Sequence, residues 1–281
     1  MNRFAFVFLV ACVSLCANAL CQQTSTGASS GVSGASRGSA SASDPDAVAL
    51  LQRVLSNLGG AGAWRSVGAA TTNVTWTMPD GTQKQIHRAD DWSGTSVLSR
   101  RDSVGSHGGT QTAIMTGQFL SHPQPDGTQK IFPKDPDLVL LAERYPGAAI
   151  LRSLQLPNCT VSMKLTLTGR WPRLPLTVSQ DETIVYEQCI EPLFPDGRCD
   201  IAWIVSPDSA TLRGVWLPVR GQMNGLITYD QVRYDKFQSI GNLSVPSNIT
   251  VIRQNGSVDT FIVDPPAFSS QMPSSIFNHK K

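Results

Sequence analysis

The histidines and acidic residues are the side chains from which acid–base catalysis would have to be built. The histidines are scattered along the chain, at His87, His107, His122 and His279. No His-x-x-x-His or P-loop spacing occurs. Asp90-Asp91 and Asp235 could supply carboxylates, but nothing in the sequence brings two of them together. We therefore expect a non-catalytic protein with no catalytic residue and no cofactor.

The cysteines could form disulfides or bind a metal. Four of them lie beyond residue 19: Cys21, Cys159, Cys189 and Cys199. A zinc site is not expected, because the sequence has neither a two-residue cysteine spacing nor nearby histidines. Cys189 and Cys199 flank the turn residues 195–197, which favours a bridge between them, with Cys159 as the competing partner. Such a bridge requires an oxidising compartment outside the cytosol.

The N-terminus predicts export. Arg3 precedes an apolar run over residues 4–16, and small residues follow, which is typical of a signal peptide (1–19) cleaved after Ala19. The run is shorter than the roughly 20 residues that cross a bilayer. We expect a protein of the periplasm or the outer-membrane periphery. As an alternative, residues 9–12 have the form of a bacterial lipobox, which would make Cys12 a lipid anchor.

Composition divides the rest of the chain into a linker and one domain. Residues 20–45 are dominated by Ser, Gly and Ala, which bury too little apolar surface to fold. Residues 46–281 are enough for a single domain. The formal net charge is +2 and no block of like charges occurs, so we expect no nucleic-acid partner. We expect a monomer that can associate with a membrane surface.

Two helices are predicted in this domain. Asp44 and Pro45 start the first one and Gly59 stops it, while Leu51 and Val54 belong to its apolar stripe. The second starts at 135–136 and ends before Pro146. Its apolar side carries Leu138 and Leu141. Both stripes must pack against another layer.

Alternating apolar and polar residues predict antiparallel strands around these helices. The clearest alternations are Val74, Trp76 and Met78 before the turn 79–81, and Val161, Met163, Leu165 and Leu167 within 160–168. Later strands are expected at 177–190, 200–206, 211–222 and 226–263. Asn255-Gly256 marks a hairpin in the last of these segments.

The order of these parts carries a family resemblance. A signal and an amphipathic helix precede a meander of strands, a short helical insert and a longer meander. Three strings accompany this order: SATLRGVWLPVRG (209–221), YDQVRYDKF (229–237) and VDPPAFSSQMPSSIF (263–277). Over residues 46–278 the chain resembles the outer-membrane lipoprotein carrier superfamily, the LolA/LolB-like proteins. It lacks two features of the carriers, the Phe-x-Gln start of the first strand and an Arg-Pro pair after the second.

The resemblance implies an α+β fold, a strongly curved antiparallel half-open β-barrel with helices across its concave face. It also implies that this apolar face holds the acyl chain of a lipid or lipoprotein. The lining would be Leu51, Val54, Val74, Trp76, Met78, Leu138, Leu141, Val161, Met163, Leu165, Leu167, Trp203, Trp216 and Phe261. The alternative is a structural or interaction domain of the envelope, whose barrel is filled by these side chains and binds no ligand.

Overall fold

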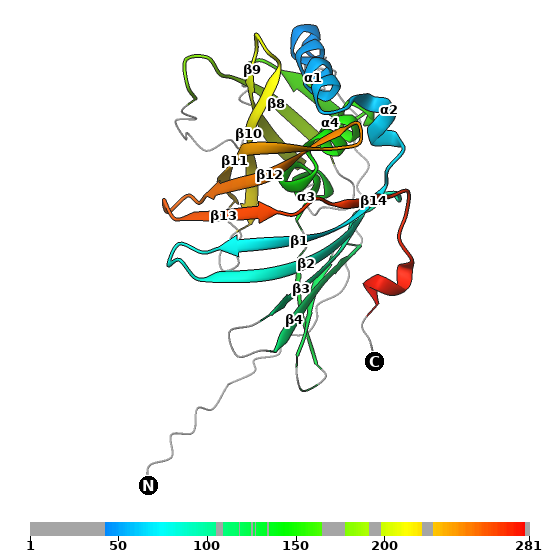
Figure 1. Ribbon diagram of the computed structural model, residues 1–281. Coiled ribbons are helices and arrows are strands. Elements are labelled where there is room, and N and C mark those ends of the chain that lie inside the picture. The colour runs from blue at the N-terminus through cyan, green and yellow to red at the C-terminus, as the bar shows by residue number, and fades with distance from the viewer. Residues whose placement is uncertain are drawn as a thin grey trace, which may run out of the picture. The chain divides into compact units, whose positions relative to one another are not determined.

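One long antiparallel sheet organises the protein, shown here as a computed structural model (Figure 1). The structure describes residues 43–104, 109–117, 119–124, 126, 128–133, 135–164, 178–190, 198–220 and 227–278. They belong to the unit Ser41–Lys281. The predicted signal peptide, the predicted linker up to residue 42, Cys12, Cys21, His107 and His279 lie outside the described residues.

The described strands pair in the order β6-β5-β4-β3-β2-β1-β13-β12-β11-β10-β9-β8-β7, with β14 also beside β1. Their bounds are β1 Ala69–Thr77, β2 Gln83–Asp91, β3 Leu98–Val104, β4 Thr110–Thr116, β5 Phe119–Pro123, β6 Gln129–Pro133, β7 Cys159–Ser162, β8 Thr183–Ile190, β9 Arg198–Ser206, β10 Thr211–Arg220, β11 Ile227–Ile240, β12 Leu243–Ile252, β13 Val258–Val263 and β14 Ala267–Ser269. The order ends at β6 and β7, so the sheet is unclosed. The predicted α+β class with a half-open antiparallel sheet is confirmed.

The pairing of β1 with β13 joins two meanders. Strands β1 to β6 form one meander and β7 to β13 the other, each from neighbours in sequence. Val74 lies opposite Val263 and Trp76 opposite Phe261. β14 pairs with the start of β1, where Phe268 lies opposite Ala70. The first described strand and the last two therefore hold the sheet together at its centre (Figure 1).

The two predicted hairpin turns form for the expected reasons. Gly81 has a φ of +82° in the turn between β1 and β2, and Asp80 Oδ1 accepts a hydrogen bond from the Thr82 amide at 2.9 Å. Gly256 has a φ of +81° between β12 and β13, and Asn255 Oδ1 accepts from the Ser257 amide at 3.0 Å. Glycine reaches these left-handed conformations without steric cost.

Both predicted helices are also present. The helical elements are α1 Pro45–Asn57, α2 Gly60–Arg65, α3 Asp137–Arg144, α4 Pro146–Gln155 and the 3-10 turn η1 Ser274–Phe277. Asp44 Oδ1 caps α1 by accepting from the Asp46 amide at 3.0 Å. Gly59 ends it with a φ of +115°, in close contact with the backbone of Asn242. Pro146 divides α3 from α4, because proline cannot continue the helix before it.

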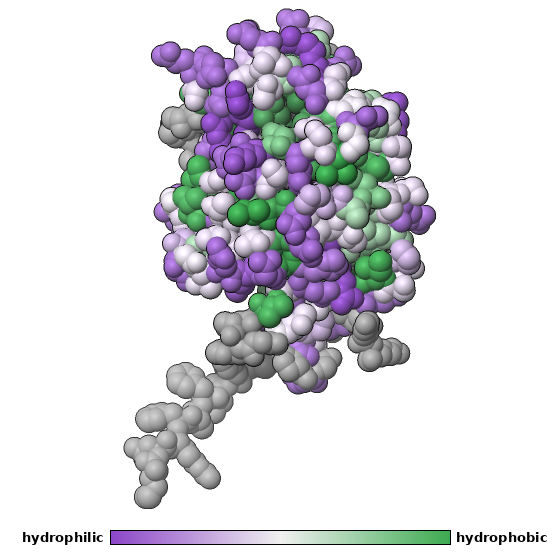
Figure 2. Space-filling model, in the orientation of Figure 1, coloured by the Kyte–Doolittle hydropathy of each residue, from purple (hydrophilic) through white to green (hydrophobic). Residues whose placement is uncertain are grey.

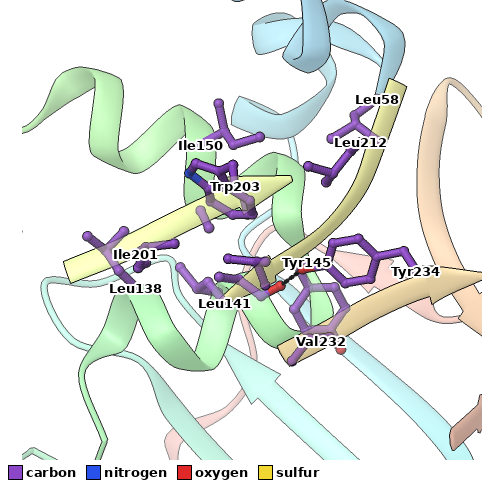
Figure 3. Close-up of a cluster of buried hydrophobic side chains, with 14 of the residues drawn as sticks. Leu58, Leu138, Leu141, Tyr145, Ile150, Ile201, Trp203, Leu212, Val232 and Tyr234 are labelled. Atoms are coloured by element: carbon purple, nitrogen blue, oxygen red, sulfur yellow. Dashed lines mark hydrogen bonds between the residues drawn. The ribbon is translucent and has the colours of Figure 1, made fainter. Parts of the chain in front are cut away.

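The helix-covered face of the sheet is filled by its own side chains. Trp203 lies opposite Val215 across β9 and β10, so both point to this face. Leu138 of α3 and Ile150 of α4 are fully buried in the same cluster, as is Trp203 (Figure 3). This layer of helix on sheet is the main hydrophobic core of the protein.

The C-terminal segment covers part of the opposite face. Met272 and Phe277 are buried against Ile114 in a second, smaller apolar cluster. The Met272 amide donates to Asp91 Oδ2 at 2.7 Å, and Arg100 Nη1 donates to the Ile276 carbonyl at 3.1 Å. The terminal string noted in the sequence is therefore a strand (β14) followed by a packed tail.

The disulfide joins Cys159 to Cys189, so the preferred pairing of Cys189 with Cys199 is wrong and the competing partner is the one used. Cys159 in β7 and Cys199 in β9 both lie directly opposite Cys189 in β8. Either partner is therefore within reach, and sequence spacing alone could not choose between them. The turn residues 195–197 lie outside the described residues.

The strand predicted over 160–168 is described only as β7, which ends at Ser162. Leu165 and Leu167 lie outside the described residues.

None of the described helices combines the length and the apolar character needed to cross a bilayer. In the space-filling view, apolar residues form separate patches among polar ones (Figure 2).

The bridge can be tested by peptide mapping. After alkylation in denaturant without reductant, we expect a disulfide-linked pair of proteolytic peptides that carry Cys159 and Cys189. Alkylation during unfolding prevents thiol exchange from reshuffling the pairing. Recovery of a linked Cys189 and Cys199 pair instead would contradict the structure.

A buried carboxyl predicts a pH dependence of stability. Glu187 is fully buried; Oε1 accepts from Ser153 Oγ of α4 at 2.7 Å, and burial raises its pKa from 4.5 to about 7. The raised pKa means that the folded state favours the protonated form, so its stabilisation is complete below pH 4.5 and is lost as pH rises through 7. We expect the free energy of unfolding to fall by roughly 2 to 3 kcal/mol between about pH 5 and 8.

Urea unfolding of Glu187→Gln should show a clearly smaller fall, because glutamine keeps a hydrogen-bonding side chain but does not titrate. Asp208→Asn, at an exposed position in the turn after β9, is the control that should keep the wild-type dependence. Equal pH dependence in wild type and Glu187→Gln would show that Glu187 is not the group responsible.

Candidate functional site

A cavity of about 630 Å³ opens where α2 and α4 meet the loop between β2 and β3. Its lining is mostly apolar. The residues that line it are Trp64, Arg65, Ser66, Val67, Gly68, Trp92, Ser93, Gly94, Thr95, Asp137, Leu141, Ala148, Leu151, Arg152, Gln155, Leu156 and Ser270. A volume of this order is typical of sites that enclose a small organic ligand.

Two tryptophans form part of this cavity's wall, and other aromatic rings pack against them. Trp64 and Trp92 each make edge-on contacts with Phe268 of β14, at ring-centroid distances of 6.1 and 6.4 Å. Trp92 also lies 4.7 Å from the ring of Tyr145. The Trp64 indole nitrogen donates to the Leu58 carbonyl at 2.9 Å. The polar atom of this ring is thus satisfied inside the protein, and the ring is held in a fixed position.

A glycine contact lets α4 approach Trp64. A Cβ atom at Gly147 would lie 2.2 Å from Trp64 Nε1, which no real side chain tolerates. The first turn of α4 therefore rests directly on the indole. Any larger residue at this position must displace the ring that lines the cavity.

Polar groups gather on α2, α3 and α4 around the cavity. Arg152 Nη2 donates to the Thr95 carbonyl at 2.7 Å and lies 3.4 Å from Asp137 Oδ2. Asp137 Oδ2 also accepts from the Val97 amide at 3.0 Å. The Gln155 amide, oriented with its oxygen toward Arg65, accepts from Arg65 Nε at 3.3 Å and Nη2 at 3.2 Å. The site therefore combines apolar walls with two guanidinium groups.

Most of the predicted lining residues lie in the core rather than at this cavity. Buried in the main cluster are Leu51, Val54, Val74, Leu138, Leu141, Val161, Trp203 and Phe261, and Trp76 and Met163 pack partly buried against it. Met78 is half-buried beyond the end of β1. Leu141 alone among the predicted residues that the structure describes is also part of the cavity lining. Ligand contact by the others stays a prediction.

Trp216 does not share the face of Trp203, contrary to the common lining expected from the sequence. Trp203 pairs with Val215, so the next residue, Trp216, points to the opposite face. The cause is a bulge between Leu212 and Gly214, which shifts the alternation of β10 by one residue. Val215 and Leu217 take the buried positions instead.

A charged cluster lies under the end of α3, next to the aromatic wall. The Asp90 carboxylate accepts from Arg144 Nη1 at 2.7 Å, from Ser99 Oγ at 2.5 Å and from the Tyr145 hydroxyl at 3.2 Å. Asp91, the other half of the acidic pair, lies on the opposite face of β2, where it binds the tail. The two carboxylates therefore cannot act together.

Two further arginines lie beside this cluster. Arg88 and Arg101 face each other across β2 and β3, and each has a buried Nε without a hydrogen-bond partner among the described residues. Burial, and then the charge of Arg88, lower the pKa of Arg101. The adjoining cavity, between Arg88 and Arg144, has a volume of only about 20 Å³, so it holds at most one water molecule.

The other candidate residues for catalysis lie apart. His87 is exposed and its Nδ1 lies 3.0 Å from Asn73 Oδ1. His122 contacts the Phe132 ring, and burial together with the charges of Arg101 and Lys130 lowers its pKa. Asp235 accepts from Thr250 Oγ1 at 2.6 Å. These contacts place none of the three at the cavity.

The two tryptophans at the cavity were not expected from the sequence to line a site. Trp64 follows a glycine- and alanine-rich turn of helix, and Trp92 follows the acidic pair at the end of β2. A usable signal existed, since both lie outside the alternating strand patterns that explain Trp76 and Trp203. Large aromatic residues in a short helix or a loop need a separate reason to be there.

Comparison with known proteins finds similar folds only among solved structures, because no family model and no curated protein matches the chain. A LolA superfamily protein from Nitrosomonas europaea is 12% identical, with 83% of this chain and 97% of that chain covered and a TM-score of 0.49. A DUF1329 family protein from Desulfovibrio piger is 8% identical, with 83% and 98% covered and a TM-score of 0.49.

The lipoprotein LppX from Mycobacterium tuberculosis is 9% identical, with 82% of this chain and 99% of that chain covered and a TM-score of 0.31. The first of these three structures bears the name of the superfamily that the sequence resembles.

The contact between α4 and Trp64 can be tested with two glycine substitutions. Gly147→Ala should lower the free energy of unfolding by roughly 1 to 3 kcal/mol, because its Cβ must displace the indole. Gly62→Ala in α2 is the matched control, since nothing lies within 4 Å of its added Cβ. It should be neutral or stabilising by up to about 1 kcal/mol. Equal stabilities of the two variants in urea unfolding would rule out the proposed packing.

Proposed function

We propose that the protein binds the acyl chain of a lipid or lipoprotein in the cavity between α2 and α4, without catalysis, as an exported protein of the cell envelope. The observation that carries the proposal is the cavity itself, about 630 Å³ with mostly apolar walls. Trp64, Trp92 and Leu151 offer the kind of surface that removes an apolar chain from water. The predicted signal peptide supports export.

The packing of the core supports this position for the acyl chain. Along the helix-covered face, Leu138, Ile150 and Trp203 fill the space between α3, α4 and the sheet. An acyl chain laid along this face would have to displace them. The cavity beside α4, α2 and the loop between β2 and β3 needs no such displacement, so binding there costs less.

The chemistry of the lining supports binding rather than catalysis. The described residues of the lining include neither histidine nor cysteine. Asp137 is their one carboxylate, and it is 3% exposed and already engaged by Val97 and Arg152. The serine and threonine hydroxyls of the lining therefore have no base in the lining to activate them.

The second candidate is a structural or interaction domain that binds no ligand. The filled face under α3 and α4 favours it, because the interior of most of the sheet is an ordinary packed core. The two functions differ in one respect that can be measured, which is occupancy of the cavity.

Blocking the cavity tests the proposal. Ala148→Trp places a large ring at the wall, and we expect it to weaken binding of the neutral apolar dye N-phenylnaphthylamine by roughly tenfold or more. Ala49→Trp, at an exposed position of α1, is the matched control and should bind the dye like wild type. Dye fluorescence titration measures both. Failure of wild type to bind the dye, or equal binding by Ala148→Trp, would favour the structural role.

A further inference from the structure

The volume of the cavity limits the number of acyl chains that it can enclose. At about 30 Å³ for each non-hydrogen atom, which is the share of a water molecule in the liquid, the cavity of about 630 Å³ holds roughly 20 such atoms. That is the size of one fatty acyl chain with its head group. A lipid with two or three long chains would leave most of its apolar surface in water.

The cavity is cationic as well as apolar. Among the described residues that line it, Arg65 and Arg152 carry positive charge and Asp137 carries negative charge, a difference of +1. Asp137 is buried and its Oδ2 is occupied by the Val97 amide and Arg152. Its charge is therefore already neutralised by groups of the protein, whereas Arg65 is exposed to solvent.

The two guanidinium groups belong to one polar cluster. Arg65 ends α2, and Arg152 lies in the last turn of α4. Gln155, three residues after Arg152 on the same helix, receives the hydrogen bonds of Arg65. The side chain of Arg152 is 23% exposed, so it can also meet a ligand from solvent.

From this arrangement we infer that the cavity takes a single-chain amphiphile with an anionic head group, a carboxylate or a phosphate. The inference rests on the proposed function and specifies its ligand. The chain lies against Trp64, Trp92 and Leu151, and the head group accepts hydrogen bonds from Arg65 and Arg152. Guanidinium groups suit both oxyanions because they donate two parallel hydrogen bonds. Of a lipoprotein anchor with several acyl chains, the cavity would enclose only one.

Displacement of N-phenylnaphthylamine from the full chain provides the test. The competitors are dodecanoate, dodecyl phosphate and dodecanol, which share one chain length, and the two-chain dioctanoyl phosphatidylglycerol. In Arg65→Gln/Arg152→Gln we expect both anions to bind about tenfold more weakly at low salt. The affinity for dodecanol should change by less than roughly twofold, because its uncharged head group forms no ion pair with the arginines. Comparison of the two anions shows which head group is preferred.

Arg53→Gln, on the exposed face of α1, is the matched control and should leave every competitor unchanged. Arg152 also donates to Thr95, so the double variant can lose the cavity itself. If the double variant no longer binds the dye, the single variant Arg65→Gln provides the test. We expect it to lower the affinity for the anions by about threefold and to leave the affinity for dodecanol unchanged.

The outcomes separate the two proposals. If wild type does not bind the dye, the proposed function fails. Wild type can bind the dye while the arginine variants weaken the binding of dodecanol and of the anions equally, or weaken the binding of neither. Either result refutes the anionic head group but leaves the apolar site standing. Displacement by dioctanoyl phosphatidylglycerol at the same concentration as dodecyl phosphate would refute the limit to one chain.

Discussion

The packing of the α3 and α4 helices on the sheet is the constraint on which the rest of the structure depends. Strands β8 to β13 present a continuous apolar face, which must be removed from water. The α3 and α4 helices, which are divided at Pro146, cover this face, and the first turn of α4 rests on Trp64 of α2. The core is filled on the side of these helices that faces the sheet, and the cavity lies along α4, against α2 and the loop between β2 and β3.

Buried charge fixes the position of these helices at a cost in desolvation. Arg144, the last residue of α3, meets Asp90 of β2 in the interior, where an unpaired charge would be strongly destabilising. Glu187 of β8 adds a second buried contact, a hydrogen bond from Ser153 of α4 to a carboxyl whose raised pKa favours the neutral form. Replacing one partner of either contact would leave the other buried without it, so these contacts favour one arrangement of helix on sheet.

Local features were predictable from the sequence and long-range ones were not. The helix at Asp44, the turns at Gly81 and Gly256 and the alternation of β1 depend on neighbouring residues, whose types determine the backbone. The disulfide partner of Cys189 and the orientation of Trp216 depend on strand register, and in β10 on a bulge. The cavity is built from segments as distant as residues 64–68 and Ser270, which only the folded sheet brings together.

The most direct test of the account is a crystal structure of the protein with a single-chain fatty acid that carries bromine at the end of its chain. The anomalous signal of bromine locates the chain without relying on weak density for methylene groups. We predict one bromine site in contact with Trp64, Trp92 or Leu151, and a carboxylate near Arg65. A bromine site between Val74 and Phe261, or a protein that crystallises with an empty cavity in saturating ligand, would contradict it.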